Sequence, residues 1–244
     1  MDWKITNVSV LEDTIFQLKL KVARQIGVLR GMTVVEIGSG QGGFTAAVAK
    51  RVGEKGRVLA IDSTREYAEE FARRLDRYSV KNRVILIQAD GTNLKNIVSD
   101  GTADIVASYR LLEELKRPDY MPRIIREMVR IVKDDGLVCL TEISAAARNE
   151  AEEAYIRLHK ESGDYLFKPD EITETMKKCE LEGISVNKVD TDIWFSPQLA
   201  KQDLGFAQVW FDPDVERRLG SMIDAYGMKY PELLIFSGKK SARN

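Results

Sequence analysis

The sequence predicts a doubly wound α/β fold, and two observations predict it. Short apolar strands alternate with helices over residues 33–143, an order that favours a parallel sheet. The strands are near-continuous runs of Val, Ile, Leu and Ala, which is typical of a parallel sheet with helices on both faces. A chain of 244 residues that is 44% hydrophobic can build such a core within one domain.

Each expected element follows from a local pattern. Strands are predicted where apolar runs stop at turn residues: 33–37, 57–62, 84–89, 103–108, 137–143, 184–195 and 233–237. Helices are predicted from apolar spacing or from Ala-rich composition: 13–26, 44–52, 63–78, 93–98, 120–132, 145–160, 170–179 and 213–226. Ser63 and Glu66 have capping-box spacing, and Asp134-Asp135-Gly136 separates a helix from the next strand.

Composition excludes several classes of protein. The 37 Lys and Arg residues balance 38 Asp and Glu, so the chain as a whole has no basic attraction to nucleic acid or anionic membrane. Two cysteines and one histidine exclude a disulfide scaffold and a multi-histidine metal centre, so no metal is expected. The start lacks a signal-peptide pattern, and no apolar run is long enough to span a membrane. We expect a soluble, reduced, cytoplasmic protein.

The glycine-rich segment 38–43 is the most informative motif. It lies between a predicted strand and a predicted helix, where glycines expose backbone N–H groups at the helix start. Gly38, Gly40 and Gly43 fit the dinucleotide-binding pattern, whereas Gly38, Gly40 and Gly42 fit a G-x-G-x-G pattern. The loop alone does not decide between the two, and a tight turn without a ligand is a third interpretation.

Three acidic positions favour a ligand with a cationic amino-acid portion. Glu36 precedes the glycines, where a carboxylate would disfavour a pyrophosphate. Asp62 ends the second strand, in position to accept hydrogen bonds from ribose hydroxyls, and Asp90-Gly91 follows the third strand, near an adenine amine. The structural alternatives are a buried salt bridge for Glu36, a helix cap for Asp62, and a cap on helix 93–98 for Asp90.

Four ordered segments resemble the motifs of class I S-adenosylmethionine-dependent methyltransferases. They are VVEIGSGQGGFT at 34–45, VLAIDST at 58–64, VILIQADG at 84–91 and ADIVAS at 103–108, and the likeness covers about residues 31–143. The resemblance implies a Rossmann-like, seven-stranded, mostly parallel sheet in which strand 233–237 runs antiparallel beside the strand that follows Ile184. A single domain would then comprise a helical segment at 1–30, a cofactor-binding core at 31–143 and a C-terminal part at 144–244.

The resemblance also implies a cofactor, S-adenosylmethionine, with S-adenosylhomocysteine as the product. The glycine loop would wrap its methionine part, with Glu36 near the amino group and Ser108 and Tyr109 on the methionine side. Asp62 would bind the ribose, and Asp90 with Gly91 the adenine. The residues expected to bind the cofactor are Glu36, Gly38, Ser39, Gly40, Gln41, Gly42, Asp62, Ser63, Asp90, Gly91, Ser108 and Tyr109.

No catalytic residue stands out, because alignment and desolvation supply most of the rate of an in-line methyl transfer. His159 is expected on a solvated helix surface, and a base over the pocket is the alternative role for it. Cys139 is expected in the core, and Tyr109 and Arg110 fit ordinary packing and surface positions equally well. The segment Ser108-Tyr109-Arg110-Leu111 lacks the Asn-Pro-Pro-Tyr element of base-amino methyltransferases, and the sequence looks most like the small-molecule branch.

Other functions stay open. A tRNA-adenine acceptor has some support from a basic cluster, although such a run is usually a solvated helix face; its members are Arg73, Arg74, Arg77, Lys81 and Arg83. A protein acceptor, an NAD-dependent oxidoreductase and a non-catalytic cofactor-binding protein are the remaining alternatives.

Two segments outside the core are expected to choose the acceptor, 145–167 and 196–230. The second is long for a connection between strands and is rich in aromatic residues, which favours a lid over the methyl group. The aromatic residues in and beside it are Trp194, Phe195, Phe206, Trp210, Phe211 and Tyr226. Packing of this insertion onto the domain, or a homodimer contact, is the alternative.

Overall fold

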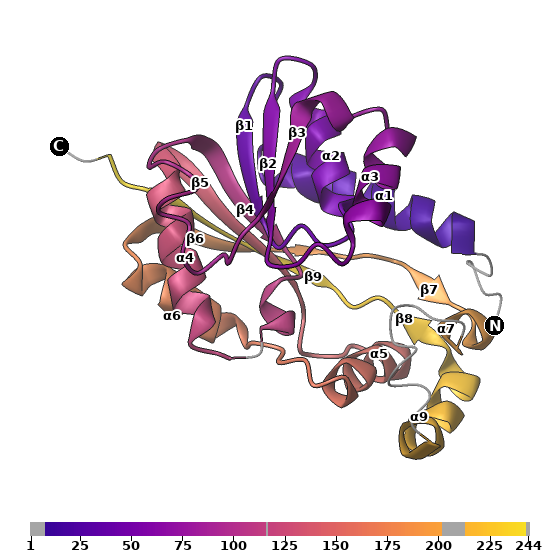
Figure 1. The fold of residues 1–244 in the computed structure, drawn as a ribbon. Helices are drawn as coiled ribbons and strands as arrows, with labels where there is room; N and C mark the ends of the chain where they lie inside the picture. Colours follow the sequence, from indigo (N-terminus) through magenta and orange to yellow (C-terminus); the bar gives the residue numbers. More distant parts are fainter. Residues whose placement is uncertain (1–7, 116, 202–212, 243–244) are drawn as a thin grey trace.

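The computed structural model describes residues 8–115, 117–201 and 213–242 (Figure 1). Its helices are α1 Val8–Gln25, α2 Gly43–Val52, α3 Ala68–Arg77, α4 Tyr120–Ile131, α5 Glu150–Glu161, α6 Pro169–Lys178, α7 Pro197–Lys201 and α9 Pro213–Tyr226, with short 3-10 helices at Lys81–Arg83 and Leu112–Glu114. Its strands are β1 Thr33–Ile37, β2 Arg57–Asp62, β3 Val84–Gln88, β4 Ala103–Tyr109, β5 Val132–Ile143, β6 Leu181–Val189, β7 Trp194–Phe195, β8 Met228–Lys229 and β9 Leu233–Lys240.

The main sheet confirms the predicted doubly wound fold. Seven strands lie in the order β3-β2-β1-β4-β5-β9-β6. Strands β1 to β5 are parallel, and β9 runs antiparallel between β5 and β6, as the family resemblance implied. The strand order reverses between β1 and β4, and a reversal of this kind opens a crevice at the carboxyl ends of the strands.

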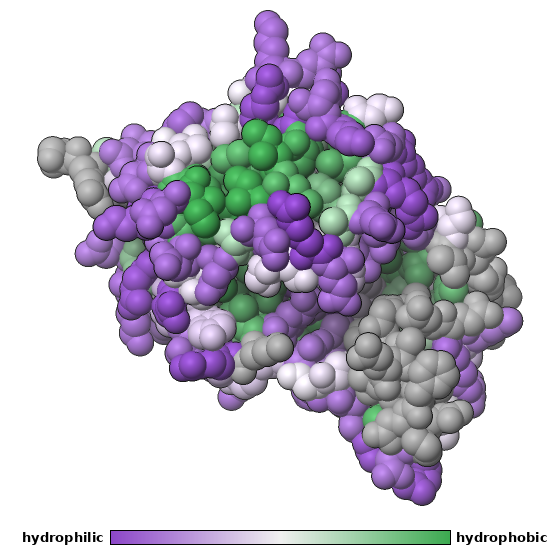
Figure 2. All heavy atoms as spheres, in the orientation of Figure 1, coloured by the Kyte–Doolittle hydropathy of each residue, from purple (hydrophilic) through white to green (hydrophobic). Residues whose placement is uncertain are grey.

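Helices cover both faces of the sheet (Figure 1). One buried cluster joins the β2 side chains Val58 and Ala60 to apolar residues of α1, α2, α3, α5 and α9. The other joins Ile61 to α4 and α6. On this second face no helix forms between β3 and β4, so Ile85 of β3 is 54% exposed. Figure 2 shows a green apolar surface in the region of β2 and β3.

Two expected helix starts differ in the structure. Ser63 and Glu66 do not form a capping box: the Glu66 N–H donates to Thr64 Oγ1, and α3 begins only at Ala68. Helix 93–98 does not form either, because the Leu94 N–H donates to the Glu127 carboxylate on α4 and fixes this segment as turns. Asp90 therefore caps a turn rather than a helix, through a 2.8 Å bond from the Thr92 N–H.

The expected break at 134–136 and the expected strand 184–195 also need correction. Strand β5 runs through Asp134-Asp135-Gly136 instead of beginning after it. Ala103 of β4 pairs with Val132 of β5, but Ile105 pairs with Leu137, so β5 has three more residues than β4 between these pairs and the register shifts there. The single expected strand 184–195 is two strands: β6 pairs with β9, whereas β7 leaves the sheet and pairs with β8. Helix α5 begins at Glu150 rather than at residue 145, capped by the Asn149 side chain.

The C-terminal insertion packs against α5. Helix α9 contacts α5 along its length, and β8 lies beside the same helix. Glu152 of α5, with no exposed side-chain area, pairs with Lys229 of β8 at 2.9 Å and with Arg148 at 2.7 Å. These contacts tie residues 213–230 to the helix that forms one wall of the site described next. Phe206, Trp210 and Phe211 lie outside the described residues.

Candidate functional site

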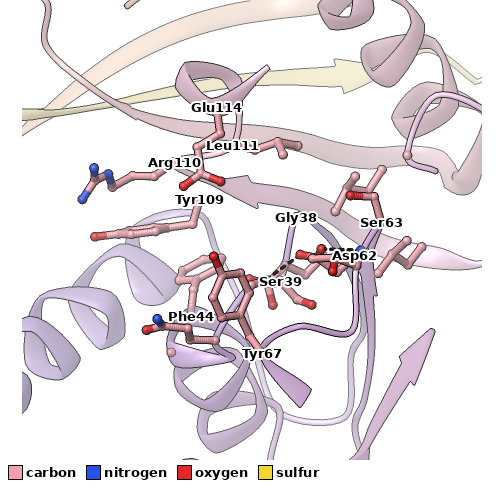
Figure 3. Close-up of a pocket in the computed structure, with 18 of the residues that line it drawn as sticks. Gly38, Ser39, Phe44, Asp62, Ser63, Tyr67, Tyr109, Arg110, Leu111 and Glu114 are labelled. Carbon is pink, nitrogen blue, oxygen red and sulfur yellow. Dashed lines mark hydrogen bonds between the residues drawn. The ribbon is translucent and has the colours of Figure 1, made fainter. Parts of the chain in front are cut away.

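A cleft of about 1020 Å³ opens at the carboxyl ends of β1, β2, β3 and β4. The end of each of these strands contributes lining residues, and α1, α3 and α5 add side walls. In Figure 3, Asp62 and Ser63 stand on one side of this cleft, while the Arg110 side chain extends away on the other. The cleft therefore has two ends with different chemistry: the β2 end near Asp62 and the end near Arg110.

The glycine loop adopts a backbone that other residues rarely take. Gly38 has φ 79° and Gly42 has φ 76°, both in the left-handed region. A Cβ at Gly38 would come within 2.6 Å of Leu111, and one at Gly42 within 2.6 Å of Phe71. The loop is thus packed from behind, and α2 begins at Gly43 with its first backbone N–H groups at the cleft.

Asp62 fixes the loop and faces the cleft at the same time. Its Oδ2 accepts a 2.7 Å hydrogen bond from the Gly40 N–H, and its Oδ1 accepts one from the Thr64 N–H at 3.1 Å. The helix-cap interpretation is wrong for this residue, because α3 begins six positions later, at Ala68. Each carboxylate oxygen has a second lone pair, so both oxygens can also accept from a ligand.

Glu36 and Lys19 are two buried ionisable groups beside the loop. Glu36 is 1% exposed and accepts a 2.5 Å hydrogen bond from Thr45 Oγ1. Burial raises its pKa from 4.5 to about 8. Burial, with the charges of Arg74 and Arg110, lowers the pKa of Lys19 to about 7. The Lys19 and Glu36 charges favour each other's ionised forms, but in both residues the effect of burial on the pKa is larger.

The structure brings most of the expected cofactor-binding residues to this cleft. Those that line it are Glu36, Gly38, Ser39, Gly40, Gln41, Asp62, Ser63, Asp90, Gly91 and Tyr109. Gly42 and Ser108 do not line it: Gly42 packs on Phe71, and Ser108 lies within β4 with no exposed area. The Ser39 hydroxyl lines the cleft, is buried and has no hydrogen-bond partner among the described residues.

Sequence reasoning missed the residues at the other end of the cleft. Arg110, Tyr155, His159 and Tyr230 all line it, although they come from β4, α5 and the approach to β9. The prediction that His159 lies on a solvated surface is wrong: it is 3% exposed. The surface prediction failed because Arg110, Asp164 and Tyr155 pack around the imidazole. Tyr155 and His159, four residues apart on that helix, were the available signal.

The described residues contain neither a candidate metal-binding cluster nor a helix that could span a membrane. No cluster of His, Cys, Asp and Glu in residues 8–115, 117–201 and 213–242 could hold a metal ion. In the same part of the chain, every helix is too short or too polar to cross a membrane.

The cleft lies where the strand order reverses between β1 and β4, and a glycine loop and carboxylates at the strand ends line it. This arrangement is typical of α/β proteins that bind a nucleoside. Comparison with known proteins specifies the family. Residues 34–136 match a family model described as a methyltransferase domain. Over these residues, which include the glycine loop and the acidic strand ends, the chain is similar to class I S-adenosylmethionine-dependent methyltransferases.

The curated relatives match only part of this chain. Ubiquinone/menaquinone biosynthesis C-methyltransferase of Idiomarina loihiensis is 30% identical over 118 residues, which cover 48% of this chain and 45% of that protein. Protein-L-isoaspartate O-methyltransferase of Thermotoga maritima is 38% identical over 66 residues, covering 27% of this chain and 20% of that protein. The chain thus spans about half or less of the length of these relatives.

Solved structures share the fold over nearly the whole chain. A cyclopropane-fatty-acyl-phospholipid synthase-like protein from Lactobacillus casei gives a TM-score of 0.73 at 16% identity, covering 97% of this chain and 94% of that one. A SAM-dependent methyltransferase from Aquifex aeolicus gives 0.54 at 18% identity, covering 91% of each chain. Similarity at these identities shows the fold alone.

Proposed function

We propose that this protein binds S-adenosylmethionine in the cleft and transfers its methyl group to a small-molecule acceptor. One observation carries the proposal: the carboxylates of Glu36, Asp62 and Asp90 end or follow β1, β2 and β3 and line one cleft around the glycine loop. Ribose hydroxyls suit the lone pairs of Asp62, and an adenine amine suits Asp90. The cofactor supplies a methyl group on a positively charged sulfur.

The residues at the β2 end of the cleft fit the zwitterionic methionine part. A ligand ammonium near Glu36 would favour its ionised form, and a ligand carboxylate near Lys19 would favour the charged amine. Lys19 and Arg74 both approach the start of α2, where a Cβ on Gly43 would collide with the Lys19 amine. Arg74 is already paired with Glu70, so the Lys19 amine together with the N–H groups of the helix start forms the site for the ligand's anionic group. The buried Ser39 hydroxyl, which lacks a partner, is available to the same ligand.

This chain's own residues would act mainly by binding, orienting and excluding water. Asp62 fixes the Gly40 amide, so the loop is already in its final conformation before a ligand binds. Tyr109 stacks on Phe44 with ring centroids 5.0 Å apart and closes the floor of the cleft between its two ends. A pre-formed and largely dry cleft aligns donor and acceptor, which is the main requirement of an in-line displacement.

The ion pairs of the basic cluster support a small-molecule acceptor over tRNA. Arg73 and Arg74 pair with Glu70, Arg77 pairs with Glu12 and Asp13, and Lys81 pairs with Asp76. Cations already paired in this way gain little from phosphates, because each phosphate contact first has to break an ion pair. One of the curated relatives described above is named for ubiquinone and menaquinone biosynthesis, and the other is named for the methylation of a protein. A protein acceptor is therefore the second candidate.

Calorimetric titration with S-adenosylmethionine, S-adenosylhomocysteine and NAD tests the proposal. We expect both adenosyl ligands to bind one site per chain and NAD to show no saturable heat. Binding of NAD alone would favour an oxidoreductase and overturn the proposal. Binding of S-adenosylmethionine without methyl transfer to any member of an acceptor panel would favour a non-catalytic cofactor-binding protein.

A further inference from the structure

At the end of the cleft away from Asp62, the Arg110 guanidinium joins residues from three distant segments. Its Nη1 donates to Tyr155 Oη at 3.0 Å and to Tyr230 Oη at 2.9 Å, and its Nη2 lies 2.9 Å from His159 Nε2. Arg110 itself has φ 55°, a left-handed conformation fixed by a 2.7 Å bond from its N–H to the Thr141 carbonyl. We call Tyr109, Arg110, Tyr155, His159 and Tyr230 the phenol cluster.

The direction of each hydrogen bond follows from arginine having donors only. The two phenol oxygens and His159 Nε2 must accept from Arg110, so the His159 proton sits on Nδ1. That nitrogen lies 2.5 Å from Asp164 Oδ2, which accepts the proton's hydrogen bond and fixes the tautomer. The phenols of Tyr155 and Tyr230 must then direct their own O–H groups to other oxygens.

A further hydroxyl of the phenol cluster, Tyr109 Oη, is buried and makes no hydrogen bond of full geometry with a described residue, although the Tyr230 phenol lies near enough to add to the effect of burial on its pKa. Burial raises the pKa of Tyr109, so this phenol keeps its proton and remains a donor. Tyr109, Tyr155 and Tyr230 all line the cleft, so this end of the cleft offers several O–H donors and a guanidinium to a ligand oxygen.

The positive charge of Arg110 in the phenol cluster is already offset within the protein. Glu113 Oε1 pairs with Arg110 at 2.5 Å, and Asp164 faces His159. Burial and the charge of Glu113 raise the pKa of Glu142 and so favour its neutral form. The same two causes raise the pKa of Glu114 to about 7. No surplus positive charge is left for a phosphate or a carboxylate. Donors without surplus charge suit a neutral group on which negative charge develops.

We propose that the phenol cluster binds the hydroxyl of a neutral phenolic or enolic acceptor, and that His159 removes its proton. The inference rests on the proposed function and names the acceptor class. The acceptor O–H bond breaks, its electron pair stays on the oxygen, and the proton forms a bond to His159 Nε2. The Arg110 N–H that occupied Nε2 turns to the new oxyanion, beside the tyrosine O–H groups. The imidazolium is then paired with Asp164.

The acidity of the acceptor follows from the strength of the base. An imidazole can remove a proton from a phenol, whose pKa is about 10, when an arginine and several O–H donors stabilise the oxyanion. The walls are aromatic as well: Tyr155 and Tyr230 both line the cleft with ring centroids 5.3 Å apart, a surface suited to a flat ring. Asp164 is a positioning residue, because it acts only through His159.

The test uses para-nitrophenol, whose phenolate absorbs visible light and whose phenol does not. The protein is saturated with S-adenosylhomocysteine, so no turnover occurs, and the absorbance of bound probe is followed against pH. We expect binding to lower the apparent pKa of the probe by about one unit or more. His159→Gln should bind the probe but abolish this shift, and Tyr230→Phe should weaken binding about tenfold. Asp164→Asn should reduce the shift without removing it.

Two controls separate the cluster from the fold and from the proposed function. Tyr226→Phe removes the hydroxyl of a tyrosine that is 40% exposed and outside the cleft, and should behave as wild type. Para-nitroanisole, which has no proton to lose, should bind more weakly than the phenol. Affinity for S-adenosylhomocysteine is measured on every variant, and its absence in wild type would refute the proposed function itself.

If S-adenosylhomocysteine binds but para-nitrophenol does not bind, or binds and stays protonated, the inference fails and the proposed function survives. An unchanged shift in His159→Gln would also overturn it. Should His159→Gln fail to fold, Arg110→Gln and Tyr230→Phe test the same stabilisation of the oxyanion. Equal probe affinity and an equal shift in wild type and both of these variants would contradict the proposal.

Discussion

The two ends of the cleft differ in how the chain builds them. The end that contains the glycine loop comes from one local segment, β1 to β2, in which Gly40 and Asp62 are 22 residues apart and bonded to each other. The opposite end is built by Arg110, Tyr155, His159 and Tyr230, with 120 residues between the first and the last. A local strand–loop–helix has a fixed order and spacing, whereas a cluster assembled by tertiary packing has none. The first can be recognised in a sequence and the second cannot.

The largest expected effect comes from filling the space in front of the glycine loop. A Cβ at Gly40 meets no atom within 4 Å, so Gly40→Val would place its side chain in the cleft itself. We expect affinity for S-adenosylhomocysteine to fall about a hundredfold, because backbone and ligand can no longer approach. Gly101→Val is the matched control: Gly101 also has a positive φ and open space around it, but lies outside the cleft.

Thermal melting and calorimetry on the two glycine variants separate strain from ligand contact. Both should melt earlier by a similar amount, since valine is strained at a positive φ. Only Gly40→Val should lose affinity. Equal affinity of both variants for S-adenosylhomocysteine would show that the cofactor does not approach this loop.

A smaller loss is expected from Asp62→Ala. Removing the carboxylate should weaken S-adenosylhomocysteine binding by about 1.5–3 kcal/mol, the usual contribution of hydrogen bonds to a charged acceptor. The same change frees the Gly40 N–H, so stability should also fall by about 1 kcal/mol. Asp62→Asn keeps an acceptor for Gly40 and should recover most of the stability but less of the affinity. A variant Asp62→Ala that is destabilised yet binds normally would make Asp62 a purely structural residue.

The smallest expected effect is a change in the pH dependence of the ligand-free protein. Burial raises the pKa of Glu36 from 4.5 to about 8, so the native state binds an extra proton between these values. The free energy of unfolding must then fall as pH rises through that range. Glu36→Gln should remove this fall, by about 2 kcal/mol between about pH 5 and pH 7.

Urea denaturation at several pH values checks this prediction for Glu36. The comparison ends near pH 7 because Lys19, whose pKa is lowered to about 7, acts in the opposite direction at higher pH. Between pH 7 and the ordinary lysine pKa of 10.5 the unfolded state binds the extra proton, so the free energy of unfolding rises with pH there. Parallel pH profiles for wild type and Glu36→Gln would mean that the carboxyl is ionised and paired in the native state.

The sequence predicted the sheet and the glycine-loop end of the cleft well, for a physical reason. Strands 33–37 and 57–62 were placed with the bounds that the structure has, because buried parallel strands are short apolar runs between turns. The same local order placed Gly38, Gly40, Asp62 and Asp90 at one edge of the sheet.

The remainder depends on contacts that a local pattern does not contain. Ser63 and Glu66 have the spacing of a capping box, but Asp62 and Thr64 take the backbone N–H groups first, and α3 begins later. His159 lies on a helix with many charged residues, and it is buried because Arg110, 49 residues away, and Asp164 pack on its ring. The role of 196–230 as a lid stays a prediction, although Tyr230 at its end lines the cleft.

One calorimetric comparison tests most directly whether the cleft has separate cofactor and acceptor ends. S-adenosylhomocysteine is titrated into wild type, Gly40→Val and Tyr230→Phe under the same conditions. The account predicts tight binding by wild type, affinity within about threefold of it for Tyr230→Phe, and a loss of about a hundredfold for Gly40→Val. No binding by wild type, or an equal loss in both variants, would contradict it.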